Sequence, residues 1–148
     1  MASRILVVDD HEATRRGIAD LIEHAGEEWI VACEAPDGRS AIDIAVGCKP
    51  DLVIMDVRMP KLDGFRAARE IRSVYPLVPV LFYTLLATPA LELSALSAGY
   101  QGVIAKPDTR ALLNAMRQLL PSKKGGGSAG GSGSNKPRAN PGSAAQAG

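Results

Sequence analysis

The sequence predicts an α/β domain of the doubly wound class, in which helices cover both faces of a parallel sheet. Short apolar runs alternate with helix-like patterns five times along residues 1–121, which is the order expected of repeated βα units. Three of the runs, at residues 5–8, 52–55 and 103–105, are unbroken and are followed by charged residues. Runs of this kind are typical of strands that are buried on both faces of a parallel sheet.

The five expected strands are short and rich in valine, isoleucine and leucine. A sheet of five such strands is expected to follow the flavodoxin-like order 2-1-3-4-5, because strands 1 and 3 then flank a topological switch point, where ligands bind. The predicted strands cover residues 4–9, 29–33, 51–56, 78–84 and 103–106.

The helices are predicted from apolar spacing and from residues that cap helix N-termini. In the first helix, Ile18, Ile22 and Ala25 recur at the i, i+4, i+7 spacing of one apolar face. Each later helix follows a side chain that can accept a hydrogen bond from the first helical turn. These caps are Asp37, Asp63, Thr88 and Asp108, and the predicted helices cover residues 11–25, 38–47, 65–75, 88–98 and 109–120.

Charge and composition divide the chain into a folded domain, residues 1–121, and a tail, residues 122–148. The domain carries all 16 acidic residues and 13 of the 17 lysines and arginines, and this acidic balance argues against nucleic acid as its main partner. The tail is rich in glycine, serine and proline and is predicted to be disordered, because it has too little apolar surface to form a core. Its composition fits a natural tail or a remnant of a longer protein.

The two cysteines, Cys33 and Cys48, match no metal-binding spacing and no disulfide framework, so we expect reduced thiols. No segment reaches 18 consecutive apolar residues, so no transmembrane helix is expected. The first residues lead directly into a strand and lack a signal-peptide pattern. Together these features predict a cytoplasmic protein that does not associate with membranes.

Charged residues follow three of the predicted strands. Asp9 and Asp10 follow the run at residues 5–8, Asp56 follows the run at 52–55, and Lys106 follows the run at 103–105. Because the carboxyl ends of parallel strands meet at one edge of a sheet, these side chains are expected to converge on one crevice. Two carboxylates about 4 Å apart repel by about 4 kcal/mol at an effective dielectric constant near 20, so such a crevice favours a cation.

The oxygen-rich composition of this crevice suits Mg²⁺, with the backbone carbonyl of Arg58 as a further ligand. A carboxylate beside such a metal, here Asp56, can act as a nucleophile that forms an aspartyl phosphate. Lys106 and the hydroxyl of Thr84 could then each contact a phosphoryl oxygen. His11 follows the acidic pair and is interpreted as a residue of the first helical turn rather than as a metal ligand.

The sequence resembles the receiver domain of bacterial two-component response regulators across residues 3–120. The motifs that carry the resemblance are Ile5 to Asp10, Pro50 to Pro60, Asp63-Gly64, Thr84, and Gly102 to Pro107. The opening Asp9-Asp10-His11-Glu12, with Arg15 and Gly17, is similar to the subfamily that usually carries a helix-turn-helix output domain.

The resemblance implies a role for each residue of the crevice. Asp56 would be the phosphoacceptor, Asp9 and Asp10 would hold Mg²⁺, and Thr84 would be a switch hydroxyl that moves toward the phosphoryl group. Lys106 would bind a phosphoryl oxygen, and the bond between Lys106 and Pro107 would be cis. The donor would be a phosphohistidine on a sensor histidine kinase or a phosphotransfer protein. The domain would catalyse only its own phosphorylation and dephosphorylation and would not otherwise be an enzyme.

Two residues depart from the pattern that this resemblance implies. Leu85 stands where the family usually has a small residue after the threonine, and it could crowd the phosphoryl site. Val103 stands where the family usually has tyrosine or phenylalanine, so the coupling of Thr84 to an aromatic ring is expected to be altered. An alternative is therefore a pseudo-receiver, a protein-interaction module that takes no phosphate.

The resemblance also implies how a receiver without an output domain would signal. The face formed by residues 88–120 would dock a partner, as a homodimer or with an output protein. A Mg²⁺-dependent phosphatase on the same fold is a further alternative. It would need a general acid two residues after Asp56, where Arg58 stands, and a cap domain.

Overall fold

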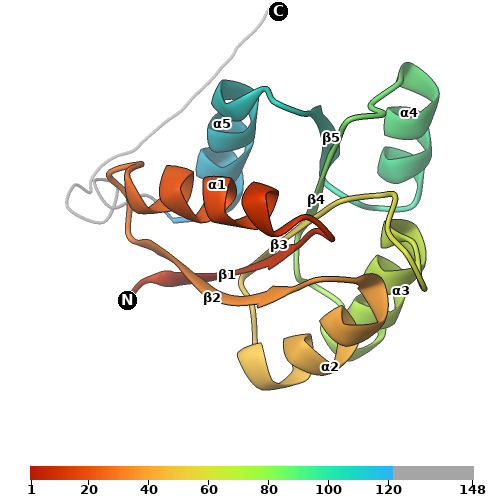
Figure 1. Ribbon diagram of the computed structural model, residues 1–148, viewed down its shortest axis with the longest axis horizontal. Helices are drawn as coiled ribbons and strands as arrows, with labels where there is room; N and C mark the ends of the chain where they lie inside the picture. Colours follow the sequence, from red (N-terminus) through yellow and green to blue (C-terminus); the bar gives the residue numbers. More distant parts are fainter. Residues whose placement is uncertain (122–148) are drawn as a thin grey trace, which may run out of the picture.

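A computed structural model describes residues 1–121 and has five parallel strands in the order β2-β1-β3-β4-β5 (Figure 1). This confirms the predicted flavodoxin-like class and strand order. The predicted disorder of residues 122–148 lies outside the described residues. Within residues 1–121, no helix has both the length and the apolar character needed to span a bilayer.

Strands and helices alternate throughout the described chain, as the sequence predicts. β4 begins later than predicted because Pro79 has no N–H to donate to a sheet. β2 continues past the predicted end at Cys33. The elements are β1 (Ser3–Val8), α1 (Glu12–Glu23), β2 (Trp29–Ala35), α2 (Gly38–Cys48), β3 (Leu52–Met55), α3 (Gly64–Val74), β4 (Val80–Thr84), α4 (Pro89–Ser97), β5 (Gly102–Ala105) and α5 (Thr109–Leu119).

All four predicted helix caps are confirmed. Each cap side chain accepts a hydrogen bond from the backbone N–H three residues later, which satisfies a donor that has no partner within the helix. The bonds run from Ser40 to Asp37 (2.8 Å), Arg66 to Asp63 (3.0 Å), Leu91 to Thr88 (3.1 Å) and Ala111 to Asp108 (3.0 Å). Local sequence therefore determines where α2, α3, α4 and α5 begin.

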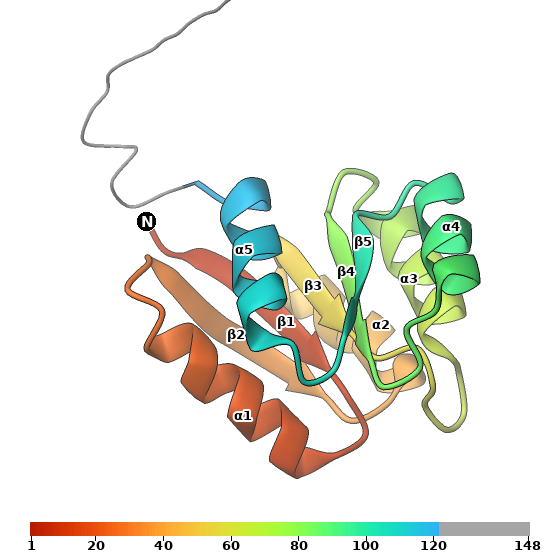
Figure 2. The ribbon, with the colours of Figure 1, turned by 90° about the horizontal axis from the view of Figure 1, so that it is seen from above.

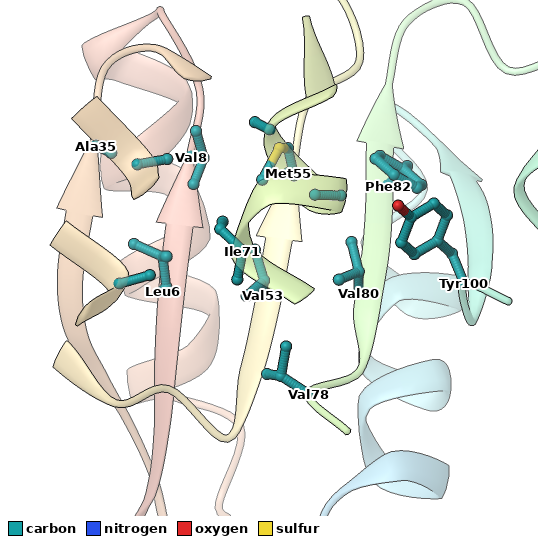
Figure 3. Close-up of a cluster of buried hydrophobic side chains, with 14 of the residues drawn as sticks. Leu6, Val8, Ala35, Val53, Met55, Ile71, Val78, Val80, Phe82 and Tyr100 are labelled. Carbon is teal, nitrogen blue, oxygen red and sulfur yellow. The ribbon is translucent and has the colours of Figure 1, made fainter. Parts of the chain in front are cut away.

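The strands divide their buried side chains between two cores, one on each face of the sheet. Helices α1 and α5 lie over one face, and α2 and α3 lie over the other (Figure 2). In β1, Ile5 and Val7 join the core beneath α1 and α5, whereas Leu6 and Val8 join the core beneath α2 and α3. Figure 3 shows the second of these cores, in which side chains of β1, β3 and β4 gather with Ile71 of α3 and Tyr100. Because both faces are covered, the central strands are apolar without interruption.

The hydrogen-bond register brings the carboxyl ends of the strands to one edge. The backbone N–H of Asp9 donates to Ala35 (3.1 Å), and that of Asp56 donates to the carbonyl of Val8 (3.0 Å). These bonds place Asp9 and Asp56, which end neighbouring strands, beside each other.

The prediction of reduced thiols is wrong for this structure, because Cys33 and Cys48 form a disulfide. Cys33 lies in β2, and Cys48 is the last residue of α2. α2 runs back along the sheet and brings the two Cα atoms to 6.3 Å, within the range that a disulfide spans. The spacing of the two cysteines in the sequence does not show this return path.

Candidate functional site

Asp9 lies immediately after β1, and its side chain is only 2% exposed. Its Oδ2 accepts a hydrogen bond from Lys106 Nζ at 2.6 Å, and its Oδ1 accepts one from the backbone N–H of His11 at 2.9 Å. Both oxygens of this buried carboxylate are therefore held in place. Burial of a carboxylate is tolerated here because a cation and a backbone donor satisfy it.

Lys106 joins the two buried carboxylates of the site. Its Nζ lies 2.6 Å from Asp9 Oδ2 and 3.1 Å from Asp56 Oδ2. Burial alone would lower the pKa of Lys106, but the hydrogen bonds and negative charges of Asp9 and Asp56 outweigh burial and raise the pKa above its ordinary value of 10.5. The lysine is therefore fully charged at neutral pH. The peptide bond between Lys106 and Pro107 is cis, as the resemblance implies.

Asp10 supplies the oxygen atom that best fits a cation. Its Oδ1 is buried and accepts no hydrogen bond from residues 1–121. The carboxylates of Asp9 and Asp10 and the ring of His11 offer atoms that all lie within 4.8 Å of one another. A buried oxygen that accepts no hydrogen bond, beside a second carboxylate, fits a hard divalent cation such as Mg²⁺.

His11 occupies the N-cap position of α1, just before the first helical turn to which the sequence assigned it. Its Nδ1 lies 3.2 Å from Asp10 Oδ1 and 3.5 Å from Asp9 Oδ1, while the side chain is largely exposed. The ring therefore borders the acidic group from the solvent side.

Thr84 ends β4 and is buried at the same edge of the sheet. Its carbonyl accepts a hydrogen bond from the backbone N–H of Lys106 (2.9 Å), and its Oγ1 accepts one from the N–H of Leu86 (3.3 Å). The threonine is thus tied to the lysine through the backbone, with its hydroxyl at the start of the loop that follows β4. Arg58 lies in the loop after β3, and the role of its carbonyl as a metal ligand stays a prediction.

Gly64 packs against the backbone of the residue proposed to accept phosphate. A Cβ built on Gly64 would collide with the carbonyl oxygen of Asp56 and crowd Val57. α3 can begin here only because this residue has no side chain. The glycine in the Asp63-Gly64 motif therefore lets α3 approach the end of β3.

Replacing Gly64 by alanine is expected to lower the free energy of unfolding by about 1–3 kcal/mol and to reduce phosphorylation, because Asp56 must shift to relieve the overlap. Gly17→Ala is the matched control, since Gly17 lies in α1 with no atom near its added Cβ. That control should instead stabilise the protein by about 0.5–1 kcal/mol. Urea titration measures the free energy of unfolding of both variants. If Gly64→Ala were as stable as Gly17→Ala, the packing argument would be contradicted.

Leu85 does not point into the core but lies 74% exposed beside the site. It lines a pocket of about 360 Å³ together with His11, Thr14, Tyr83, Lys106 and Pro107. Leu85 therefore shares an open pocket with the lysine. The predicted crowding at the phosphoryl site stays a prediction.

β5 contains no aromatic residue. Val103 is half-buried and packs against the core that contains Phe82 and Tyr100. The Tyr100 ring meets that of Phe82 edge-on, with centroids 5.2 Å apart (Figure 3). Tyr83 lies on the other face, with its ring 6.0 Å from Lys106 Nζ, and burial raises the pKa of its phenol.

One residue contacts the site although the sequence did not predict this contact. Arg15, in α1, donates from Nη1 to the carbonyl oxygen of Asp9 at 2.6 Å. The sequence shows only an arginine one helical turn beyond the acidic pair, and arginines at that distance usually face solvent. Only the structure shows that the arginine turns back onto the Asp9 carbonyl and also binds Glu34 of β2.

A doubly wound domain that gathers buried carboxylates, a lysine and a threonine at the carboxyl edge of its sheet belongs to the phosphoacceptor class of signalling domains. Residues 5–117 match the family described as "Response regulator receiver domain". The chain belongs to this family, and its function is that of a receiver: it accepts a phosphoryl group in two-component signalling.

Similar proteins agree with this assignment. The chain is 36% identical over 107 residues to the chemotaxis protein CheY of Thermotoga maritima, covering 72% of this chain and 88% of that protein. It is 36% identical to the response regulator MprA of Mycolicibacterium vanbaalenii, covering 81% of this chain but only 51% of MprA. A solved structure of a LuxR-family two-component response regulator from Aurantimonas sp. SI85-9A1 matches with a TM-score of 0.75 and 32% identity, covering 80% of this chain and 85% of that one.

Proposed function

We propose that Asp56 is the phosphoacceptor and that Asp9, Asp10 and the backbone carbonyl of Arg58 hold the Mg²⁺ ion that this reaction needs. The observation that carries the proposal is the position of Lys106, whose Nζ contacts the buried carboxylates of Asp9 and Asp56 together. The lysine thereby marks the point at which a phosphoryl group on Asp56 would meet a fixed positive charge.

The proposed reaction is a transfer between two side chains. A carboxylate oxygen of Asp56 attacks the phosphorus of a phosphohistidine, the phosphorus–nitrogen bond breaks, and an acyl phosphate forms on Asp56. Lys106 binds one phosphoryl oxygen, and the Thr84 hydroxyl binds another as the switch. Mg²⁺, when bound, neutralises charge on the transferring oxygens. Water later attacks the phosphorus and returns inorganic phosphate and the free carboxylate, so the domain catalyses only its own phosphorylation and dephosphorylation.

The proposed partners follow from the donor and from the exposed surface. A sensor histidine kinase or a phosphotransfer protein supplies the phosphoryl group. Residues 88–120 form the docking face for a second copy or for an output protein, and Leu93 and Leu96 of α4 are at least half exposed on it. The domain formed by residues 1–121 has a net negative charge and is not proposed to bind nucleic acid. Its proposed location is the cytoplasm.

Intact-mass spectrometry after incubation with acetyl phosphate tests the proposed function. We expect the protein to gain one phosphoryl group with Mg²⁺ present, and to gain none with EDTA or in Asp56→Asn, because that amide is not a nucleophile. Asp51→Asn, which changes an exposed aspartate at the opposite end of β3, is the matched control and should label normally. Equal labelling of Asp56→Asn would overturn the assignment. Failure of the wild-type protein to label would favour the pseudo-receiver.

A further inference from the structure

We propose that Arg15 is a positioning residue for the metal-binding turn Asp9-Asp10. The proposal rests on the proposed function, because it assumes that these two aspartates hold the cation. Arg15 is not itself proposed to touch the cation or the phosphoryl group. It acts through the backbone of Asp9.

The guanidinium group of Arg15 connects three elements at the edge of the sheet. Nη1 donates to the carbonyl oxygen of Asp9 at 2.6 Å, and Nε donates to Glu34 Oε1 at 3.1 Å. Arg15 lies in α1, Asp9 follows β1, and Glu34 lies in β2. The side chain of Arg15 is only 15% exposed, which is unusual for an arginine on a surface helix. A planar guanidinium with two anchored donors holds one orientation.

The hydrogen bond between Arg15 and the Asp9 carbonyl lies just beyond the last hydrogen bonds of the sheet. β1 ends at Val8 and β2 ends at Ala35, after Asp9 has donated its own N–H to Ala35. Arg15 supplies the donor for the Asp9 carbonyl beyond that point. Because this carbonyl and the N–H of Asp10 belong to one planar peptide group, fixing the oxygen also fixes the direction in which the chain enters Asp10.

The same peptide group orients both carboxylates of the proposed metal site. Asp9 Oδ1 is bound to the N–H of His11, and Asp10 Oδ1 is the buried oxygen that accepts no hydrogen bond. If the Asp9 carbonyl were released, the turn that carries these oxygens could rotate. Groups that orient metal ligands from outside the coordination sphere typically change metal affinity 10–100-fold when they are removed.

The direction in which Mg²⁺ affinity changes on removal of Arg15 distinguishes a positioning role from a purely electrostatic one. Arg15 is a positive charge near the acidic group, so its electrostatic effect alone opposes the binding of Mg²⁺. Removing it should therefore strengthen Mg²⁺ binding if charge were its only role. Loss of positioning has the opposite sign and weakens binding.

Calorimetric titration of Mg²⁺ into the full chain compares Arg15→Met with Arg16→Met. Arg16 is the matched control, because it lies next in α1, is exposed and pairs with Glu12 of the same helix. We expect the Kd for Mg²⁺ to rise about 10-fold or more in Arg15→Met and to stay unchanged or fall in Arg16→Met. An unchanged or lower Kd in Arg15→Met, or an equal rise in both variants, would overturn the proposal.

Amide hydrogen exchange, measured by NMR in metal-free protein, tests the role of Arg15 without Mg²⁺. If the wild-type chain bound no Mg²⁺ in the titration, that result would count against the proposed function, and the exchange experiment would still decide whether Arg15 holds the turn. The N–H of His11 should exchange faster in Arg15→Met, on the order of 10-fold, because its bond to Asp9 depends on the turn. The N–H of Ile54 in the central strand reports global stability and corrects for it. Unchanged protection of His11 after this correction would show that Arg15 does not hold the turn.

Discussion

Replacing Lys106 by methionine is expected to lower the free energy of unfolding by about 3–5 kcal/mol in metal-free protein. The side chains of Asp9 and Asp56 are 2% and 9% exposed, and Lys106 is the cation that contacts both of them. Removing one partner of a buried ion pair leaves an uncompensated charge in a poorly solvated place, which accounts for the size of the effect. A loss of this size corresponds to a fall in Tm of about 10–20 °C for a domain of this length.

The pH dependence of this difference follows from the raised pKa of Lys106. A lysine whose pKa is higher in the folded than in the unfolded protein stabilises the fold below the unfolded pKa, and this contribution is lost as pH rises through the folded pKa. The difference between the wild-type protein and Lys106→Met should therefore persist through neutral pH. On the alkaline side, this difference in stability should narrow above about pH 10.5, as Lys106 of the folded protein loses its proton.

Chemical denaturation with EDTA and with Mg²⁺ measures this prediction. Mg²⁺ should stabilise Lys106→Met more than the wild-type protein, because the ion then supplies the positive charge that the lysine no longer provides. Lys61→Met is the control: Lys61 is exposed, pairs with Asp37 at 3.7 Å and should contribute less than about 1 kcal/mol. Equal losses in the two variants would contradict the role assigned to burial. Phosphorylation should also fall in Lys106→Met, whereas Lys61→Met should be phosphorylated normally.

Reduction of the disulfide between Cys33 and Cys48 is expected to lower the free energy of unfolding by about 3 kcal/mol. The two residues are separated by 15 positions, and a cross-link that closes a loop of this size restricts the unfolded chain by about that amount. The corresponding fall in Tm is about 10 °C. The bond joins β2 to the end of α2, so its loss should loosen that side of the sheet first.

Denaturation with and without a dithiol reductant tests the disulfide, and the double variant Cys33→Ala/Cys48→Ala is the control that should not respond. Alkylation before and after reduction, followed by intact-mass measurement, counts the thiols. No alkylation should occur before reduction, and two groups should be added after it. Two free thiols in the untreated protein would instead support the thiol state expected from the sequence. The proposed cytoplasmic location contains reductants that keep thiols reduced, so the stability of the reduced protein is the value that would apply there.

The architecture could be predicted from the sequence because its signals are local. Unbroken apolar runs mark strands that are covered on both faces, and Asp37, Asp63, Thr88 and Asp108 mark helix starts through bonds that span only three residues. The strand order followed from the rule that strands 1 and 3 of a flavodoxin-like sheet flank a topological switch point. Boundaries were less predictable: the start of β4 depends on which backbone groups a neighbouring strand can reach.

The candidate site was predictable for a related reason. Side chains that follow parallel strands must gather at one edge, so the positions of Asp9, Asp56 and Lys106 in the sequence already imply their proximity. The structure adds the contacts that the rule does not specify. These are the bridge made by the lysine, the buried oxygen of Asp10 that accepts no hydrogen bond, and the exposed position of Leu85.

The sequence by itself therefore determined the fold class, the strand order and the residues of the acidic edge, because hydrophobic pattern, capping and strand ends are read along the chain. Only the tertiary structure decided that Cys33 meets Cys48 and that Arg15 meets the Asp9 carbonyl. The two cysteines lie 15 positions apart, and Arg15, although it follows Asp9 closely in the sequence, is also held by Glu34 of β2, so both contacts depend on how α2 and α1 lie across the sheet. Such packing is set by the whole core, so no local pattern records it.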